Sequence, residues 1–264
     1  LPRAENAHVR VFVQDSQPVP VPARDASNGR WIAATPENAP DIPALPLMFG
    51  LRLQQALGVP VGILTASEGG TAIPCWLPQS VFGKYEDLKT FWGSYPWQPE
   101  DGDEAYLKWV SNRQTHDAEN ARRAAVGEAP LPWSKYLFFG PRGPRCKAQP
   151  SGLYNGEIHP LIRFKINGVV WYQGESDSEE SSQYARHLRE LIATWREAWG
   201  LSELRFFVVQ IVRCAVDEMT ENFPAIREAQ SSVADQTAGV FLVPGIDFGD
   251  PLDIHPADKD LLAA

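Results

Sequence analysis

The stretch GVVWYQGESD, residues 168–177, changes character at its centre. Residues 168–173 are mostly apolar and rich in β-branched and aromatic side chains, which predicts a buried strand. Carboxylates follow at once, at Glu175 and Asp177, before a helix is predicted to begin near Ser182. A buried strand that runs into polar residues and a helix is typical of a parallel α/β sheet, where ligands bind at the carboxyl ends of the strands.

The same alternation of strands and helices continues on both sides of this stretch. The run VGIL at 61–64 suits a strand buried on both faces, and apolar residues at helical spacing mark a helix at 182–199. We therefore expect an α/β fold with a mostly parallel sheet covered by helices on both faces. Further strands are expected at 8–14, 205–212 and 239–243, and further helices at 47–57, 157–164 and 225–233.

Two stretches depart from this alternation. The proline-rich segment that follows residue 14 and ends at Pro46 is expected to be largely loop. From about Pro78 to Pro150 the sequence is irregular, with a charged helical stretch near 104–128, and we expect an insertion or lid there. No internal repeat is visible, so residues 1–264 are expected to form a single domain with one inserted excursion.

Composition narrows the classes of function. The 264 residues are 44% hydrophobic, and 33 acidic against 24 basic residues give a formal net charge of -9. That charge repels nucleic acid and anionic membrane surfaces, so neither is expected as a partner. No run of about 18 apolar residues could cross a bilayer, and the first residues lack the apolar core of a signal peptide. Either no export signal exists, or it has been removed or lies outside this numbering.

The cysteines, Cys75, Cys146 and Cys214, show no CxxC pair and no metal-ligand spacing. An odd number of cysteines cannot all pair within the chain. Two states are compatible with the sequence: one disulfide with one buried thiol, or three buried free thiols. The cysteines therefore do not determine the redox compartment.

Paired glycines follow the predicted strand at 61–64, in the turn SEGGT at 67–71. Glycine accepts a positive φ and lets the backbone approach a ligand, which leaves amide N–H groups available to bind an oxyanion. For this segment alone an ordinary tight turn is the simpler interpretation, since glycine is a common turn residue.

Two polar segments follow strands later in the chain. In WYQGESD, Gln173 and Glu175 come at the carboxyl end of a strand, although the carboxylates could equally cap the next helix. In LDIHP, His255 lies close in sequence to Asp250 and Asp253. A histidine that activates a hydroxyl needs a carboxylate to orient it, but a histidine beside carboxylates is also common at protein surfaces.

The order of these segments is more specific than any one of them. GVPVGILTASEGGTAIPCW, then YNGEIHPLIRFKINGVVWYQGESD, and finally IDFGDPLDIHPADK resemble the sialate O-acetylesterase-like family of SGNH hydrolases, from about His8 to Lys259. The resemblance implies a flavodoxin-like three-layer α/β/α fold that removes acetyl groups from sugar hydroxyls without a metal or organic cofactor. It also implies an extracellular, periplasmic or lysosomal location.

The resemblance assigns roles to individual residues. In this family a serine attacks the ester carbonyl, a histidine takes its proton, and amides bind the tetrahedral oxyanion. His255 then matches the general base, with Asp253 as the residue that orients it and Asp250 as the second candidate. Gly70 and Gln173 match the oxyanion-hole positions. The supporting or substrate-facing positions match Glu175, Asn155 and Trp76.

The nucleophilic serine is the main departure from the family. The family carries it in a Gly-Gln-Ser-Asn segment upstream of the strand that matches residues 8–14, and no such segment occurs here. A second departure is Glu68, where the family has tryptophan. Ser67, Ser151 and Ser176 are the serines nearest the motifs, and none follows a strand in a comparable way.

Three explanations are open: the chain is the larger piece of a split enzyme, a segment of a longer polypeptide, or a catalytically inactive relative. We expect one of the first two, because a parallel sheet that lacks a central strand exposes unpaired edges and apolar surface.

The leading hypothesis is a carbohydrate O-acetylesterase whose nucleophile lies on a segment upstream of, or separate from, this chain. The alternatives are a carbohydrate-binding relative that has lost catalysis and an α/β module with a purely structural role. Sialic acid, xylan, pectin and xyloglucan are all open as carriers of the acetyl group.

Overall fold

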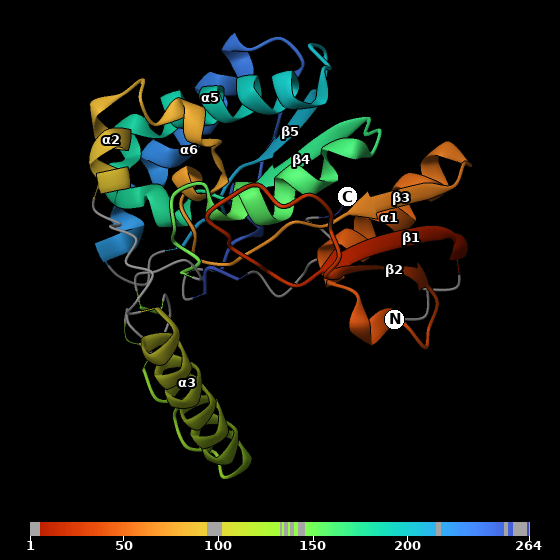
Figure 1. The fold of residues 1–264 in the computed structure, drawn as a ribbon. Coiled ribbons are helices and arrows are strands. Elements are labelled where there is room, and N and C mark those ends of the chain that lie inside the picture. The colour runs from red at the N-terminus through yellow and green to blue at the C-terminus, as the bar shows by residue number, and fades with distance from the viewer. Residues whose placement is uncertain are drawn as a thin grey trace.

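The computed structural model describes residues 6–93, 102–132, 134, 137, 140–141, 146–214, 218–250, 253–255 and 263. Its strands form two three-stranded sheets, named here sheet A (order β2-β1-β3) and sheet B (order β4-β5-β6) (Figure 1). Helices lie beside both sheets, so the α/β class expected from the sequence is confirmed. The strands are β1 (Asn6–Gln14), β2 (Gly29–Ala34), β3 (Val61–Leu64), β4 (Gly168–Tyr172), β5 (Arg205–Val209) and β6 (Val240–Val243).

Sheet A contains a strand that the sequence analysis missed. β1 pairs parallel with β3, but β2 pairs antiparallel with β1, inside the segment expected to be loop. The loop expectation was wrong at residues 29–34, because pairing with a distant strand, and not local propensity, determines this short strand. Gly29 is needed where the pairing begins, since a Cβ at that position would lie 2.1 Å from Cζ of Phe12.

Helix α1 (Ala44–Leu57) covers one face of sheet A. Val9 and Val11 of β1 are fully buried in a cluster with Leu47 of α1. Gly50 brings the helix close to the sheet, because a Cβ there would lie only 3.0 Å from Cγ1 of Val9. Alternate residues of β1 point to the opposite face, so His8 and Arg10 lie on the side that α1 does not cover.

Sheet B is parallel throughout and carries the larger core. Phe206 and Val208 of β5 are fully buried, and α5 (Ser181–Trp199) and α6 (Phe223–Gln236) pack into the same core. The indole of Trp171 on β4 packs edge-on against that of Trp195 on α5, with 5.9 Å between ring centroids. The helix predicted from apolar residues at helical spacing is confirmed. The apolar residues that define this spacing are all buried: Leu188, Leu191, Ile192 and Trp195.

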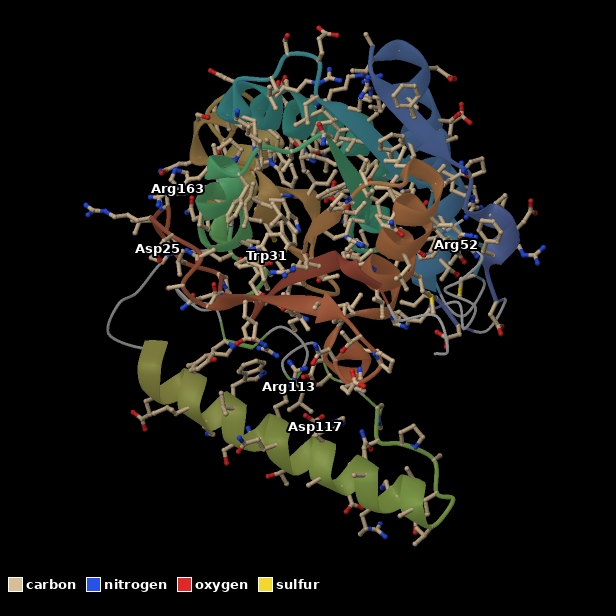
Figure 2. All side chains as sticks on the ribbon, turned by 90° about the vertical axis from the view of Figure 1, so that its right-hand side faces the viewer. Asp25, Trp31, Arg52, Arg113, Asp117 and Arg163 are labelled. Atoms are coloured by element: carbon tan, nitrogen blue, oxygen red, sulfur yellow. The ribbon has the colours of Figure 1, made fainter. Side chains whose placement is uncertain are left out.

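The excursion between sheets A and B contains helices. α2 is Glu86–Gly93 and α3 is Gly102–Ala125, and α3 projects away from both sheets (Figure 1). The helix expected near 104–128 is thus confirmed. Arg113 and Asp117, an ion pair 4.0 Å apart, lie on the upper side of α3 in Figure 2. Residues 94–101, 133, 135–136, 138–139 and 142–145 of the expected excursion lie outside the described residues.

Short helical turns complete the described structure. A π-helical turn and a 3-10 helix occupy the region where one regular helix was expected at 157–164. No helix in the described part of the chain is long and apolar enough to cross a membrane. The short elements are η1 (Ala39–Asp41), η2 (Ile73–Trp76), η3 (Gln79–Val81), η4 (Tyr154–Ile158), η5 (His159–Arg163), η6 (Glu175–Glu180), η7 (Glu218–Asn222) and η8 (Ile246–Phe248).

Candidate active site at the carboxyl ends of β3 and β4

The glycine turn lies just beyond the carboxyl end of β3. Gly70 has a φ of 72°, a conformation that glycine adopts without strain, which explains the residue type at this position. The Thr71 hydroxyl donates to the carbonyl of Glu68 at 2.8 Å, and the Trp76 indole N–H donates to the Thr71 hydroxyl at 3.0 Å. These hydrogen bonds fix the turn between β3 and η2.

Lys147 holds the same turn from the returning end of the excursion. Its Nζ donates to the carbonyl of Gly69 at 2.8 Å and lies 3.3 Å from Oε1 of Glu68. Burial lowers the pKa of Lys147, although the Glu68 carboxylate acts in the opposite direction. Glu68, which replaces the tryptophan of the related family, therefore has a structural partner in this chain.

Gln173, at the end of β4, connects the second motif to the glycine turn. Its Nε2 donates to the carbonyl of Thr71 at 3.0 Å and to Oδ2 of Asp177. The Tyr184 hydroxyl and Nε2 of Gln230 hold the Gln173 carbonyl from behind, at 2.8 and 3.0 Å. The two segments therefore meet at one edge of the structure, and the side-chain amide of Gln173 is occupied by protein acceptors.

Asp177, which the sequence places either at the carboxyl end of a strand or as a helix cap, is buried beside Gln173. Its carboxylate is 5% exposed and accepts the backbone N–H of Ile73 at 3.1 and 3.3 Å. Burial raises the pKa of Asp177 to about 7, against the hydrogen bonds from Gln173 and Ile73. Asp177 thus joins η6 to η2 across the site, a contact that no local sequence pattern signals.

Glu175 connects this region to the C-terminal motif. Burial raises the pKa of the Glu175 carboxyl, and the positive charge of His255 opposes that rise. His255 is therefore within electrostatic reach of a residue two positions after Gln173. The glycine turn and WYQGESD are thus joined by hydrogen bonds, and the charge of His255 in LDIHP acts on WYQGESD.

Asp253 contacts His255. Its Oδ1 accepts the backbone N–H of His255 at 2.7 Å and lies 3.4 Å from the imidazole Nδ1. Asp250 joins Asp253 through the backbone, where Asp253 N–H donates to the Asp250 carbonyl at 3.4 Å. The His255 side chain is 79% exposed, so its imidazole is accessible from solvent. Leu252 and Pro256 of the motif lie outside the described residues.

Comparisons with known proteins bear on this arrangement. Residues 150–255 match the family described as carbohydrate esterase, sialic acid-specific acetylesterase. The sialate O-acetylesterase of Rattus norvegicus is 30% identical over 236 residues, which cover 82% of this chain and 40% of that protein. The resemblance to the sialate O-acetylesterases is confirmed. The Homo sapiens sialate O-acetylesterase is 26% identical over 235 residues, 82% of this chain and 36% of that protein.

Solved structures agree in fold. A carbohydrate acetylesterase from Xanthomonas citri superposes with a TM-score of 0.69 at 25% identity, over 98% of this chain and 47% of that chain. A protein from Arabidopsis thaliana superposes with a TM-score of 0.50 at 16% identity, which bears on the fold alone. This chain therefore spans less than half the length of the sialate O-acetylesterases and of the bacterial acetylesterase that it resembles.

Asn155 and Trp76, matched to supporting positions by the resemblance to the sialate O-acetylesterases, are both buried in the structure. Asn155 Nδ2 donates to the carbonyl of Val19 at 3.2 Å, which anchors the loop after β1. The Trp76 indole packs edge-on against Trp171, with 6.2 Å between centroids. Both side chains therefore support the walls of the site.

Glu157 was not singled out from the sequence, yet it is fully buried between the exits of β1 and β3. Its Oε1 accepts the Ser16 hydroxyl at 2.8 Å. Burial raises the pKa of Glu157 to about 7, and hydrogen bonds from Ser16 and from the backbone of Gln17 and Ser67 act against the rise. The available signal was a carboxyl group in the motif YNGEIHPL, which has no other acidic residue.

No serine hydroxyl donates to a histidine among the residues that the structure describes. Ser16 follows β1, but its hydroxyl is directed to Glu157. Metal ligands are not grouped in this part of the chain either, since no cluster of three His, Cys, Asp or Glu side chains there could hold an ion. The three cysteines are buried and form no disulfide with one another.

Proposed function

We propose that this chain is the histidine-bearing part of a carbohydrate O-acetylesterase. Two contacts support the proposal: Gln173 donates to the glycine turn at the Thr71 carbonyl, and Asp253 lies beside the imidazole of His255, whose charge opposes the rise in the pKa of Glu175. Acyl transfer needs a base and an oxyanion site within reach of one carbonyl, and His255 and the glycine turn are proposed to supply them at this rim.

The roles follow from the chemistry of ester hydrolysis. His255 takes the proton of the attacking serine, while Asp253 beside Nδ1 fixes the tautomer and stabilises the imidazolium. The N–H of Gly70 faces the developing oxyanion. Gln173 joins it as a side-chain donor once the ester oxygen replaces the Thr71 carbonyl as its acceptor. Each donor of this kind contributes about 10²–10³ in rate.

The nucleophile is proposed to lie on a segment upstream of this chain or on a separate small chain. Two facts support this placement. No described serine is bonded to a histidine, and no strand pairing joins β3 of sheet A to β4 of sheet B within the described residues. Free edges of parallel strands are rarely left uncovered, so an additional strand at either edge would complete the sheet and bring a serine to the same rim.

The substrate is proposed to be an acetylated sugar, as the names of the similar proteins indicate, with sialic acid among the candidates. An extracellular, periplasmic or lysosomal location belongs to the same proposal. A catalytically inactive carbohydrate-binding relative is the second candidate. It is favoured by one observation, that protein acceptors occupy both amide hydrogens of Gln173.

The test is acetate release from p-nitrophenyl acetate and from an O-acetylated sugar, by the native polypeptide or by this chain combined with its nucleophile segment. We expect His255→Ala to lower kcat/KM by about 10²–10⁴, because it removes the general base. Asp253→Asn should lower it more than Asp250→Asn. His116→Gln, on the distant α3, is the matched control and should leave activity unchanged.

Two results would contradict the proposal. If His255→Ala hydrolysed the substrates as fast as the wild type, His255 would not be the general base. A larger loss of kcat/KM in Asp250→Asn than in Asp253→Asn would show that the orienting carboxylate is misassigned. Intact mass and N-terminal sequence of the native material distinguish the second candidate, because an inactive relative would carry no nucleophile-bearing segment and release no acetate.

A further inference from the structure

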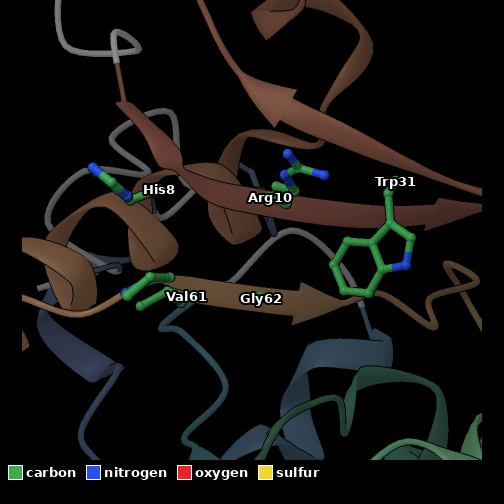
Figure 3. Close-up of a pocket in the computed structure, with 6 residues that line it drawn as sticks. His8, Arg10, Trp31, Val61 and Gly62 are labelled. Carbon is green, nitrogen blue, oxygen red and sulfur yellow. The ribbon is translucent and has the colours of Figure 1, made fainter.

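Sheet A has a second face, turned away from α1, that carries a pocket. Its volume is about 460 Å³, within the range of small-ligand sites. The pocket lies at the amino-terminal ends of β1 and β3, whereas the candidate active site lies at the carboxyl ends. The lining residues are His8, Arg10, Trp31, Pro60, Val61 and Gly62 (Figure 3).

Trp31 provides a fixed aromatic surface in this pocket. The side chain is 44% exposed, yet its ring is held by Phe12 and Phe164, at centroid distances of 5.4 and 6.3 Å. The ring lies over Gly62, where a Cβ would come within 3.3 Å of it. Figure 2 shows Trp31 on the body of the molecule, away from the α1 face. An exposed, immobilised indole offers a flat apolar surface at little entropic cost.

Arg10 adds a positive charge on the same face. In the register of sheet A it lies opposite Gly62, which has no side chain to cover the pocket floor. Its guanidinium makes no hydrogen bond or ion pair with any described residue, and it is exposed. His8, two residues earlier, projects to the same side. No carboxylate of the described residues lines the pocket, although the whole chain carries a net charge of -9.

A guanidinium without a protein partner, beside an exposed indole, matches a ligand with one carboxylate and one apolar ring face. A pyranose ring presents such a face through its axial C–H groups, and a guanidinium binds a carboxylate through two parallel hydrogen bonds. We propose that this pocket is a non-catalytic binding site for a carboxylate-bearing sugar unit, with the ring stacked on Trp31 and the carboxylate on Arg10. The site is independent of the proposed esterase activity.

The test is a titration of the full chain with methyl β-D-glucuronide, followed through the Trp31 indole N–H signal and the Gly62 amide signal. Methyl β-D-glucoside is the neutral control ligand. For a ligand of this size we expect saturation with a Kd of about 1 mM. Arg10→Gln should weaken binding about tenfold, as expected for loss of a charge-assisted contact. Trp31→Ala should abolish the saturable shift at Gly62.

Matched control variants lie on other elements. Trp92→Ala removes another partly exposed tryptophan, on α2, and Arg205→Ala removes another exposed arginine, on β5; both should bind as the wild type does. Equal affinity for the neutral glucoside, or no saturable shift with the glucuronide, would overturn the proposal. So would a sugar-independent shift of the Trp31 signal that follows protein concentration, because a second copy of the chain would then cover this face.

Discussion

Glu157 and Asp177 are buried beside the candidate active site, and each has a pKa raised to about 7. Both connect segments far apart in the chain, since Ser16 and Glu157 are 141 positions apart and Ile73 and Asp177 are 104 positions apart. Sequence patterns single out Gly70 and Gln173, whose roles are proposals, because a glycine pair and a polar residue after a strand are local features. They could not predict these two carboxyl groups, because their partners are distant.

Glu157 should make stability depend on pH. The pKa of Glu157 is about 7 in the folded protein, against the ordinary value of 4.5 that applies in the unfolded chain. Between these two pH values the folded state therefore binds a proton that the unfolded state has released. Stability from this group is therefore complete below pH 4.5 and is lost as pH rises towards 7 and above, by about 3 kcal/mol at most. Urea unfolding of wild type and Glu157→Gln at pH 5 and pH 8 measures the difference.

We expect Glu157→Gln to show a smaller loss of unfolding free energy between the two pH values than the wild type, because glutamine does not titrate. Asp177, which titrates in the same range, leaves part of the slope in place. Glu203→Gln, at an exposed position, is the control and should keep the wild-type slope. If the unfolding free energy of Glu157→Gln fell between pH 5 and pH 8 as much as that of the wild type, the Glu157 carboxyl would ionise in the folded protein without loss of stability.

At the scale of elements, predictions succeeded where local pattern and burial agree. The strand expected at 61–64 matches β3, and the helix expected at 182–199 matches α5 within one residue. β2 was not predicted, because it is stabilised by antiparallel pairing with β1. The local sequence, a proline-rich stretch, does not indicate that pairing. One helix was expected at 157–164, but π and 3-10 turns form over 154–163, where the chain meets the loop after β1.

Gly156 marks that contact and provides a test of it. A Cβ on Gly156 would lie 1.7 Å from the carbonyl oxygen of Gln17, which is backbone and cannot rotate away. Gly156→Ala should therefore lower the free energy of unfolding by about 3 kcal/mol or more, since η4 and the loop must separate. Gly83→Ala, where a Cβ meets nothing within 4 Å, should change it by less than about 0.5 kcal/mol.

Chemical denaturation of the two alanine variants beside the wild type gives both values. A Gly156→Ala protein as stable as Gly83→Ala would mean that the loop after β1 does not pack on η4. In that case the buried position of Glu157, one residue further on, would also lose its support.

At the scale of the whole molecule, the two sheets divide the functions proposed here. Sheet B and its helices anchor Gln173 and carry the larger core, while sheet A supplies β3 and the glycine turn. The α/β class could be predicted from the alternation of elements, but the division into two sheets could not, because it depends on which distant strands pair. In the two proposals, the carboxyl rim serves ester chemistry and the amino end of sheet A binds a sugar.

The central claim is that the glycine turn, WYQGESD and His255 share one rim in solution. A nitroxide on Gly69→Cys tests it directly, because Gly69 is exposed and the native cysteines are buried. The measurement is paramagnetic broadening of the His255 imidazole signal, assigned with His255→Gln. A nitroxide on Val126→Cys, beyond the far end of α3, is the control. We predict that the His255 signal is lost with the label at 69 and kept with the label at 126; an unbroadened His255 signal with the label at 69 would contradict the claim.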